Sequence, residues 1–252
     1  MLISDPLFYL TAIPAVLLYG MAKGGLGGAA AALAIPLMAL TTEPLTAAAI
    51  LLPIICVMDV HVIMLYRDNF DRDSLKVVVP AALAGVLLGA LLMGYLSADH
   101  MRLMVGGIAV AFSLQFWLFG DRGDAMLGSK LSGYFWGTVA GVTSTHIHAG
   151  GPPVSVYLLS KKLEKATLIG TLGVFFAVLN VVKLVPYTVL DQFNSTRLIT
   201  SLALIPLAPI GVRAGYWIAE RLDTELLYKI IYVFLFISGV KLLLDGVAGA
   251  GM

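Results

Sequence analysis

The sequence predicts an all-α polytopic membrane protein built from two inverted-topology repeats, and three observations lead to this fold class. Of the 252 residues, 60% are hydrophobic and only 12% are charged, which is far more apolar than an average water-soluble domain. Apolar runs long enough for a helix to cross about 30 Å of hydrocarbon recur along the chain. Two longer apolar regions are interrupted by glycine in the same way, and the segments that follow them resemble each other.

Six apolar runs are predicted to cross the membrane as single helices, and they leave no room for a soluble domain. They cover residues 44–66, 77–96, 103–119, 166–190, 198–219 and 226–244. The N-terminal stretch carries Asp5 and no basic residue ahead of its apolar run. It therefore lacks the positive region of a cleavable signal peptide, and we expect the first apolar segment to be retained.

The two longer apolar regions, residues 7–40 and 131–160, are predicted to be broken helices. The first is interrupted at GMAKGGLGG (20–28) and the second at HAGGPP (148–153). Glycine permits tight backbone geometry and proline ends helices. Each region is followed by three apolar runs, so the breaks mark the start of two similar halves.

An ungapped match between later segments supports a duplication of the chain. Residues 80–96 lie over 206–222, so that Pro80, Gly85, Gly89 and Leu96 match Pro206, Gly211, Gly215 and Leu222. At the breaks, Gly20 and Gly24 are aligned with Gly137 and Gly141, and Gly27 and Gly28 with Gly150 and Gly151. The predicted organisation is a first repeat at 1–120, a linker loop at 121–130 and a second repeat at 131–252, which together form one integral membrane unit.

The positive charges of the loops favour a re-entrant hairpin at 131–160, because lysine and arginine are retained on the cytoplasmic side. If all eight apolar segments crossed, the two sides would hold seven and six of these charges. If 131–160 enters and returns, the loops at 67–76, 122–130, 161–165 and 221–229 share one face with ten charges, against three on the other. Apart from Lys23, no basic residue flanks the first broken segment, so the charges do not test its topology, and re-entry is expected from symmetry alone. Inverted repeats with interrupted helices are a transporter architecture.

Only a few ionisable residues lie inside the apolar segments, where each costs about 2.5–3.5 kcal/mol or more and usually faces a pathway or a partner. They are Lys23, Asp59, His61, His146, His148, Lys183 and Arg213. Lys23 and both histidines lie beside the breaks. A restarting half-helix offers unpaired N–H groups and a favourable dipole to an anion, so the breaks predict anion binding, although close helix packing alone would also favour glycine.

The histidines leave three interpretations open: a metal site, hydrogen bonding to the open backbone at the break, and substrate binding or proton coupling. Side chains two residues apart on a helix point about 200° apart, so His146 and His148 could not share an ion there. Asp59 and His61 also face different ways. Arg213 either pairs with Asp59 or belongs to the substrate site. The single cysteine, Cys56, excludes an intramolecular disulfide.

The glycine motif at 20–28, the GGPP at 150–153 and the N-x-x-K of Asn180 and Lys183 resemble the sulfite exporter TauE/SafE family, also called the toluenesulfonate uptake permease family. The resemblance covers both halves of the chain. It implies a multi-pass transporter of sulfur-containing oxyanions, such as sulfite or organosulfonates, in the bacterial inner membrane. It leaves open the exact substrate, the direction of transport and the oligomeric state.

We therefore expect a secondary transporter that is not an enzyme, binds no cofactor, metal or nucleic acid, and has a small anion and the lipid bilayer as partners. Coupling to protons or sodium stays open, and the alternatives are a membrane-embedded metal-dependent enzyme and a passive anion channel. The expected substrate-binding residues are Lys23, Gly24, Gly27, Gly28, His146, His148, Gly150, Gly151, Pro152, Asn180 and Lys183. Asp59, His61 and Arg213 are expected to act in coupling or in an ion pair.

Overall fold

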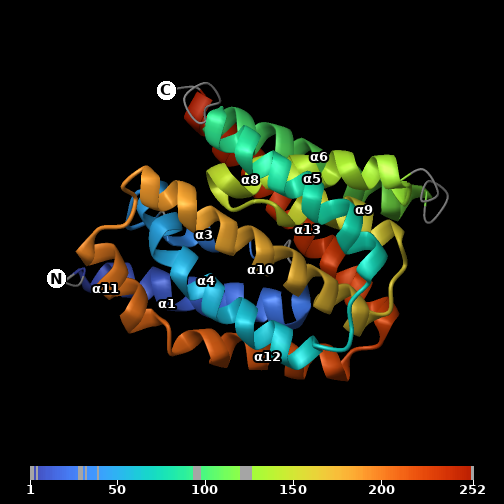
Figure 1. Ribbon diagram of the computed structural model, residues 1–252, viewed down its shortest axis with the longest axis horizontal. Helices are drawn as coiled ribbons and strands as arrows, with labels where there is room; N and C mark the ends of the chain where they lie inside the picture. The colour runs from blue at the N-terminus through green and yellow to red at the C-terminus, as the bar shows by residue number, and fades with distance from the viewer. Residues whose placement is uncertain are drawn as a thin grey trace.

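The computed structural model of the protein describes residues 3, 5–27, 31, 33–38, 40–92, 98–119 and 127–250. Within these ranges the regular elements are all helices (Figure 1). They are α1 (Pro6–Met21), η1 (Ala22–Leu26), α3 (Ala34–Met38), α4 (Pro44–Tyr66), α5 (Arg72–Leu91), α6 (Ala98–Phe119), α8 (Lys130–Ile147), α9 (Gly151–Ser160), α10 (Lys165–Val189), α11 (Ser195–Leu204), α12 (Leu207–Arg221) and α13 (Thr224–Ala250).

Several helices have the length and composition of membrane spans. Five qualify singly among the described residues, and the bent pair α11 and α12 adds a sixth. The five cover Pro6–Leu26, Leu45–Tyr66, Arg72–Leu91, Lys165–Val189 and Thr224–Gly249. The predicted run 103–119 lies within α6. The expectation of an all-helical membrane protein is thus confirmed.

The predicted run 198–219 is not one straight helix. It is divided into α11 and α12, which meet at an angle of 44°. The division falls at Pro206, which precedes the first residue of α12. Proline has no N–H to donate and its ring clashes with the carbonyl four residues earlier, so the helix bends there.

Both predicted breaks occur at the glycine motifs, but the first comes later in its motif than expected. The helix continues through Gly20 and Gly24, widens into the π-turn η1, and ends at Gly27 with φ 85° and ψ 150°. Only glycine adopts this backbone conformation without strain. The expected restart at Gly28 lies outside the described residues. In the second motif, α8 ends at His148, which is left-handed (φ 50°), and α9 begins at Gly151.

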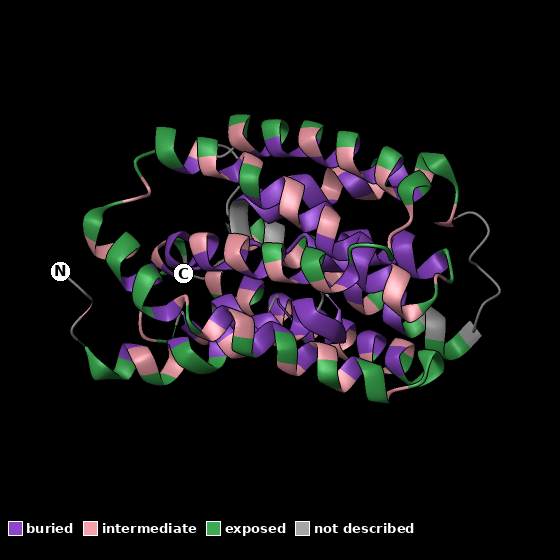
Figure 2. Ribbon diagram, turned by 60° about the horizontal axis from the view of Figure 1, so that its bottom comes forward, coloured by how far each residue is buried: buried purple, intermediate pink, exposed green. Residues whose placement is uncertain are grey.

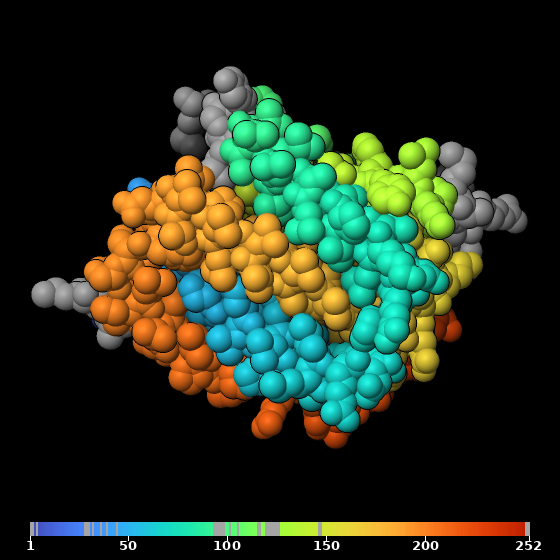
Figure 3. Space-filling model, in the orientation of Figure 1, coloured from blue at the N-terminus to red at the C-terminus, as the bar shows by residue number. Residues whose placement is uncertain are grey.

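The broken helices pack closely against partners from the other half of the chain. α1 and η1 lie on α12, and α8 lies on α5. Glycine allows the backbones to touch: a methyl group added at Gly20 would lie 2.8 Å from Gly211 Cα, and one added at Gly141 would lie 2.9 Å from Gly85 Cα. α4 packs on α10 and α6 on α13. Figure 3 shows α4, α5 and α10 side by side on one face of the molecule.

The connections gather at two ends of the molecule. At one, Lys161 Nζ lies 3.5 Å from the Gly128 carbonyl, and Lys165 Nζ donates to the Leu222 carbonyl at 2.6 Å. We call this the lysine-rich end, formed by residues 67–71, 127–130, 161–164 and 222–223. At the opposite end, Ile3 N donates to Thr200 Oγ1 at 3.3 Å. Buried residues concentrate along the centre between these ends, and exposed ones lie outside (Figure 2).

Candidate functional site

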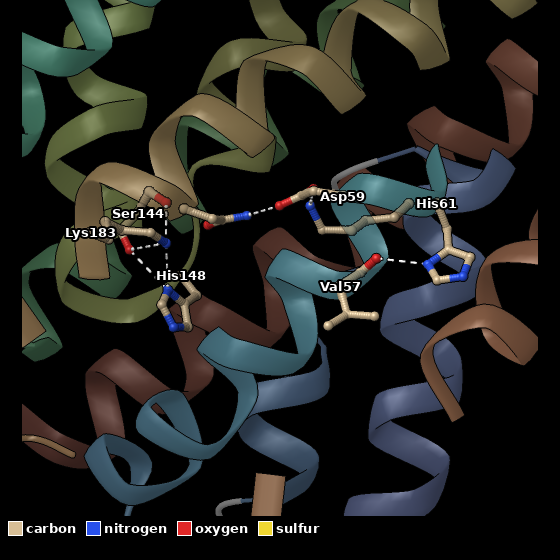
Figure 4. A network of polar contacts seen from close by, with 8 residues as sticks. Val57, Asp59, His61, Ser144, His148 and Lys183 are labelled. Atoms are coloured by element: carbon tan, nitrogen blue, oxygen red, sulfur yellow. Dashed lines mark hydrogen bonds and ion pairs between the residues drawn. The ribbon is translucent and has the colours of Figure 1, made fainter. Parts of the chain in front are cut away.

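Polar side chains from four helices and one break meet in the buried centre of the molecule. They are Lys23 of η1, Asp59 of α4, Ser144 of α8, His148 of the second break, and Asn180 and Lys183 of α10. None is more than 8% exposed. Figure 4 shows Ser144, His148 and Lys183 on one side of this cluster and Asp59 on the other. Five of the six belong to the residues predicted from the sequence.

Asp59 is held by two partners. Lys23 Nζ forms an ion pair with Asp59 Oδ1, and Asn180 Nδ2 donates to Asp59 Oδ2 at 2.7 Å. The Lys23 ammonium also lies 5.1 Å from the ring centre of Phe176, a distance that allows a cation–π contact. Each carboxylate oxygen of Asp59 therefore has a hydrogen-bond donor, and the charge of Lys23 is neutralised.

Lys183 is buried without a carboxylate. Its ammonium lies 3.0 Å from Ser144 Oγ, 3.3 Å from the Ser144 carbonyl oxygen and 2.9 Å from His148 Nδ1. An ammonium has three donors and no acceptor, so these neutral acceptors use all three. No ion pair to Lys183 occurs in the part of the chain that the structure describes. The cluster thus holds two lysines and one aspartate, with the surplus positive charge on Lys183.

Both ring nitrogens of His148 have polar neighbours. Nδ1 lies 2.9 Å from the Lys183 ammonium and 3.1 Å from the Ser144 carbonyl oxygen, and Nε2 lies 3.2 Å from the Ala48 carbonyl oxygen. With Lys183 charged, Nδ1 accepts from its ammonium, and Nε2 then carries the hydrogen that faces Ala48. The left-handed backbone of His148 ends α8 and turns the ring back toward Ser144, one helical turn earlier.

The local sequence explains how α10 contributes. Asn180 and Lys183 are three residues apart, so they lie on the same face of the helix. Asn180 reaches Asp59 of α4, which pairs with Lys23 of the first broken segment, and Lys183 reaches Ser144 of the second. The N-x-x-K spacing identified in the sequence accounts for this arrangement.

The start of α9 supplies two free backbone donors beside the cluster. No side chain caps the helix, and within the described chain no acceptor bonds the N–H of Gly150 or Gly151. Pro152 and Pro153 have no N–H. A methyl group at Gly150 would lie 3.0 Å from Ser144 Cβ, so the backbone of Gly150 packs against the residue that contacts Lys183. Gly150, Gly151 and Pro152 are all buried.

The remaining predicted residues are placed differently. His61 is partly buried, its Nδ1 lies 2.9 Å from the Val57 carbonyl, and Figure 4 shows it away from His148 and Lys183. Pairing of Arg213 with Asp59 is wrong, because Arg213 is exposed on α12 while Asp59 bonds Lys23 and Asn180.

Of the remaining predicted residues, Gly24 lies in η1 and Gly27 directly follows it. Gly24 packs against the backbone of α12, and its carbonyl accepts a hydrogen bond from Tyr66 Oη at 2.8 Å. Gly27 forms the break itself. Gly28 and the side chain of His146 lie outside the described residues.

The sequence analysis missed Ser144 of the cluster and Tyr187, which lies against the cluster. Ser144 has no ionisable group, although it stands one turn before His148 on α8. Tyr187 stands one turn after Lys183 on α10, and its ring stacks on that of His148 with 5.8 Å between centres. Positions i−4 and i+4 from the predicted residues share their helix faces, and this spacing was the available signal.

Metal ligands do not gather in the described part of the molecule. No group of three His, Cys, Asp or Glu side chains there is arranged to hold an ion. The donors that do gather are cationic or neutral N–H groups, which favour an anion.

A cavity of about 460 Å³ opens at the lysine-rich end. It is lined by Leu65, Tyr66, Asn69, Lys165, Ala166, Ile169, Tyr216, Ala219 and Glu220. Ile169 also lines a much smaller space that reaches Lys23, Gly27 and Phe176. The cavity and the buried cluster are therefore separated by a short apolar layer of α10.

Apolar helices of membrane-spanning length around a buried, cation-rich polar cluster indicate an integral membrane protein. The chain matches the sulfite exporter TauE/SafE family over residues 12–242. It belongs to that family, and the resemblance found in its sequence is confirmed. No match was found among curated proteins or among solved structures.

Proposed function

We propose that this protein is a secondary transporter that moves a small sulfur-containing oxyanion, such as sulfite, a sulfonate or a related organosulfonate, across the bacterial inner membrane. One observation carries the proposal: the Lys183 ammonium is 1% exposed and has no carboxylate partner in the described structure. An uncompensated buried charge is costly, and a bound anion would neutralise it. The family is one of sulfite exporters, which agrees with an anionic substrate.

The anion site that we propose centres on the second break. Lys183 provides the charge, and the free N–H groups of Gly150 and Gly151 and the hydroxyl of Ser144 provide donors. The first break contributes differently from our expectation, since Lys23 is already neutralised by Asp59. In this proposal the Lys23–Asp59 pair positions Asn180 and α10, and the substrate charge is met by Lys183.

We also propose that the two halves are inverted repeats with re-entrant broken helices. In support, Gly85 packs on Thr138 and Gly141 as Gly211 packs on Leu17 and Gly20. These contacts pair Gly20 with Gly141, one helical turn away from the pairing with Gly137 inferred from sequence. The same shift pairs Gly27 with His148, the two residues at which the helices end with positive φ.

The orientation in the membrane follows from the charges. Nine basic residues of the described chain lie at or near the lysine-rich end: Arg67, Arg72, Lys76, Lys130, Lys161, Lys162, Lys165, Arg221 and Lys229. Arg102, Arg197 and Lys241 belong to the opposite half of the molecule. The positive-inside rule assigns the lysine-rich end to the cytoplasm.

One face of α10 provides a route from the cytoplasm to the site. Lys165 and Ile169 line the cavity, Phe176 lies beside Lys23, and Asn180 and Lys183 belong to the cluster. These positions follow one another at steps of three, four or seven residues, so they share a helix face. Displacement of Ile169 and Phe176 would connect the cavity with the site.

Replacing Lys183 by methionine tests the proposal. Sulfite flux into proteoliposomes should be lost. The purified variant should stay as stable as the parent or become more stable, because methionine has a similar volume to lysine and its substitution removes a buried charge. The matched control is Lys161→Met at the exposed lysine-rich end, which should retain flux. Parent-like flux in Lys183→Met would refute the proposed site.

A further inference from the structure

Tyr187 carries a polar atom that the folded protein leaves unused. Its side chain is 2% exposed, and its hydroxyl is fully buried without a hydrogen-bond partner in the described structure. Buried polar groups are nearly always hydrogen-bonded, because an unmade bond costs free energy. An orphan hydroxyl next to a binding site therefore calls for an explanation.

The position of Tyr187 ties this hydroxyl to the cluster. Tyr187 follows Lys183 by four residues on α10, so the two side chains share a helix face. Side chains on a helix lean toward its N-terminus, which directs Tyr187 over the turn of Lys183. The ring is nearly parallel to that of His148, at an interplanar angle of 9° and with 5.8 Å between centres. His148 in turn contacts Lys183.

The packing holds the ring in this place. His148 covers one side, and the ring of Phe193 lies 5.9 Å away. A phenylalanine would make the same ring contacts, so packing does not account for a tyrosine here. The hydroxyl is thus a buried donor with no acceptor in the described structure, on a ring that stacks against His148, and His148 contacts the Lys183 ammonium.

We propose that the Tyr187 hydroxyl donates a hydrogen bond to an oxygen of the bound sulfur oxyanion and is a specificity-determining residue of the site. This inference rests on the proposed function and adds a residue to it. The substrate would supply both missing partners, a negative charge for Lys183 and an acceptor for Tyr187. A monatomic anion of the same charge would satisfy Lys183 but reach Tyr187 less well than a tetrahedral or pyramidal oxyanion.

The test is Tyr187→Phe in the purified full-length protein, with sulfite as the probe and binding followed by thermal stabilisation. We expect the Kd for sulfite to rise about ten- to hundredfold, the range for a hydrogen bond to a charged group. The ligand-free variant should melt at the same temperature as the parent or higher, because no internal hydrogen bond is lost.

Tyr228→Phe is the matched control. The Tyr228 hydroxyl donates to the Leu163 carbonyl at 2.7 Å, so its removal should lower the melting temperature without changing the Kd for sulfite. Tyr187→Phe would overturn the inference either by binding sulfite like the parent or by losing ligand-free stability as Tyr228→Phe does.

Lys183→Met, measured in the same series, separates the two proposals. Loss of sulfite binding in Lys183→Met together with parent-like binding in Tyr187→Phe would remove only the role of Tyr187. Parent-like binding in Lys183→Met would remove the proposed site itself.

Discussion

Asn180 of α10 donates a hydrogen bond to Asp59 of α4, with 2.7 Å between Nδ2 and Oδ2. The two residues lie well inside helices from different halves of the chain. Asp59 also pairs with Lys23, and Asn180 stands one turn before Lys183. This single bond therefore connects the neutral Lys23–Asp59 pair with the positively charged part of the cluster.

Removing Lys23 should destabilise the protein strongly. Lys23→Ala leaves the Asp59 carboxylate buried without its counter-ion, and we expect a loss of about 3–5 kcal/mol. The double substitution Lys23→Met with Asp59→Asn removes both charges and should recover most of the lost stability. Thermal unfolding in detergent measures both variants. The control is Lys76→Ala, whose partner Asp73 is exposed, and its effect on stability should be small because solvent screens an exposed ion pair. Equal effects at the two sites would contradict the buried pair.

Asn180→Asp should weaken substrate binding. The new carboxylate would lie beside Asp59 and compensate the charge of Lys183, and an anion would then meet like charge, which costs several kcal/mol. We expect the Kd for sulfite to rise by about tenfold or more. Asn194→Asp makes the same chemical change at the cap of α11, where Asn194 accepts from Arg197 N and aspartate caps as well. Its affinity should not change, and a similar loss in both variants would show a nonspecific charge effect.

The glycine contacts of the broken helix should tolerate no side chain. A methyl group at Gly24 would lie 2.1 Å from the Val212 carbonyl oxygen, whereas one at Gly107 would meet nothing within 4 Å. Gly24→Ala should therefore destabilise by about 1–3 kcal/mol. Gly107→Ala should stabilise by about 0.5–1 kcal/mol, since alanine favours a helix. Chemical or thermal unfolding compares them, and a neutral Gly24→Ala would show that η1 and α12 do not touch.

The two ends of the second broken segment should be accessible from the same side of the membrane. In a Cys56→Ser background, we expect a membrane-impermeant maleimide to label Ser195→Cys in intact cells. Lys130→Cys and Lys161→Cys should both react only after permeabilisation. Labelling of Lys130→Cys and Lys161→Cys from opposite sides would mean that the segment crosses.

The sequence was informative where local chemistry determines the structure. Glycine and proline marked the two breaks, and the cost of burying charge selected Lys23, Asp59, His148 and Lys183. It was uninformative where partners depend on the rotation of helices about their axes. Arg213 was predicted as an ion-pair partner of Asp59, but Arg213 is exposed and Asp59 pairs with Lys23. Tyr187 was not predicted as a site residue, because tyrosine carries no charge and is common as a packing residue in membrane helices.

In the proposed transport cycle, the glycine contacts of α1 and η1 with α12 would also affect kinetics. Gly20 meets Gly211, and Gly24 meets Val212, through backbone atoms. Where backbones touch, no side chain must change rotamer when one helix is displaced along the other, so this contact adds little to an activation barrier. Interconversion between conformations would then be limited by the polar bonds of Asp59 with Lys23 and Asn180, and turnover rate would depend on the residues that also organise the cluster.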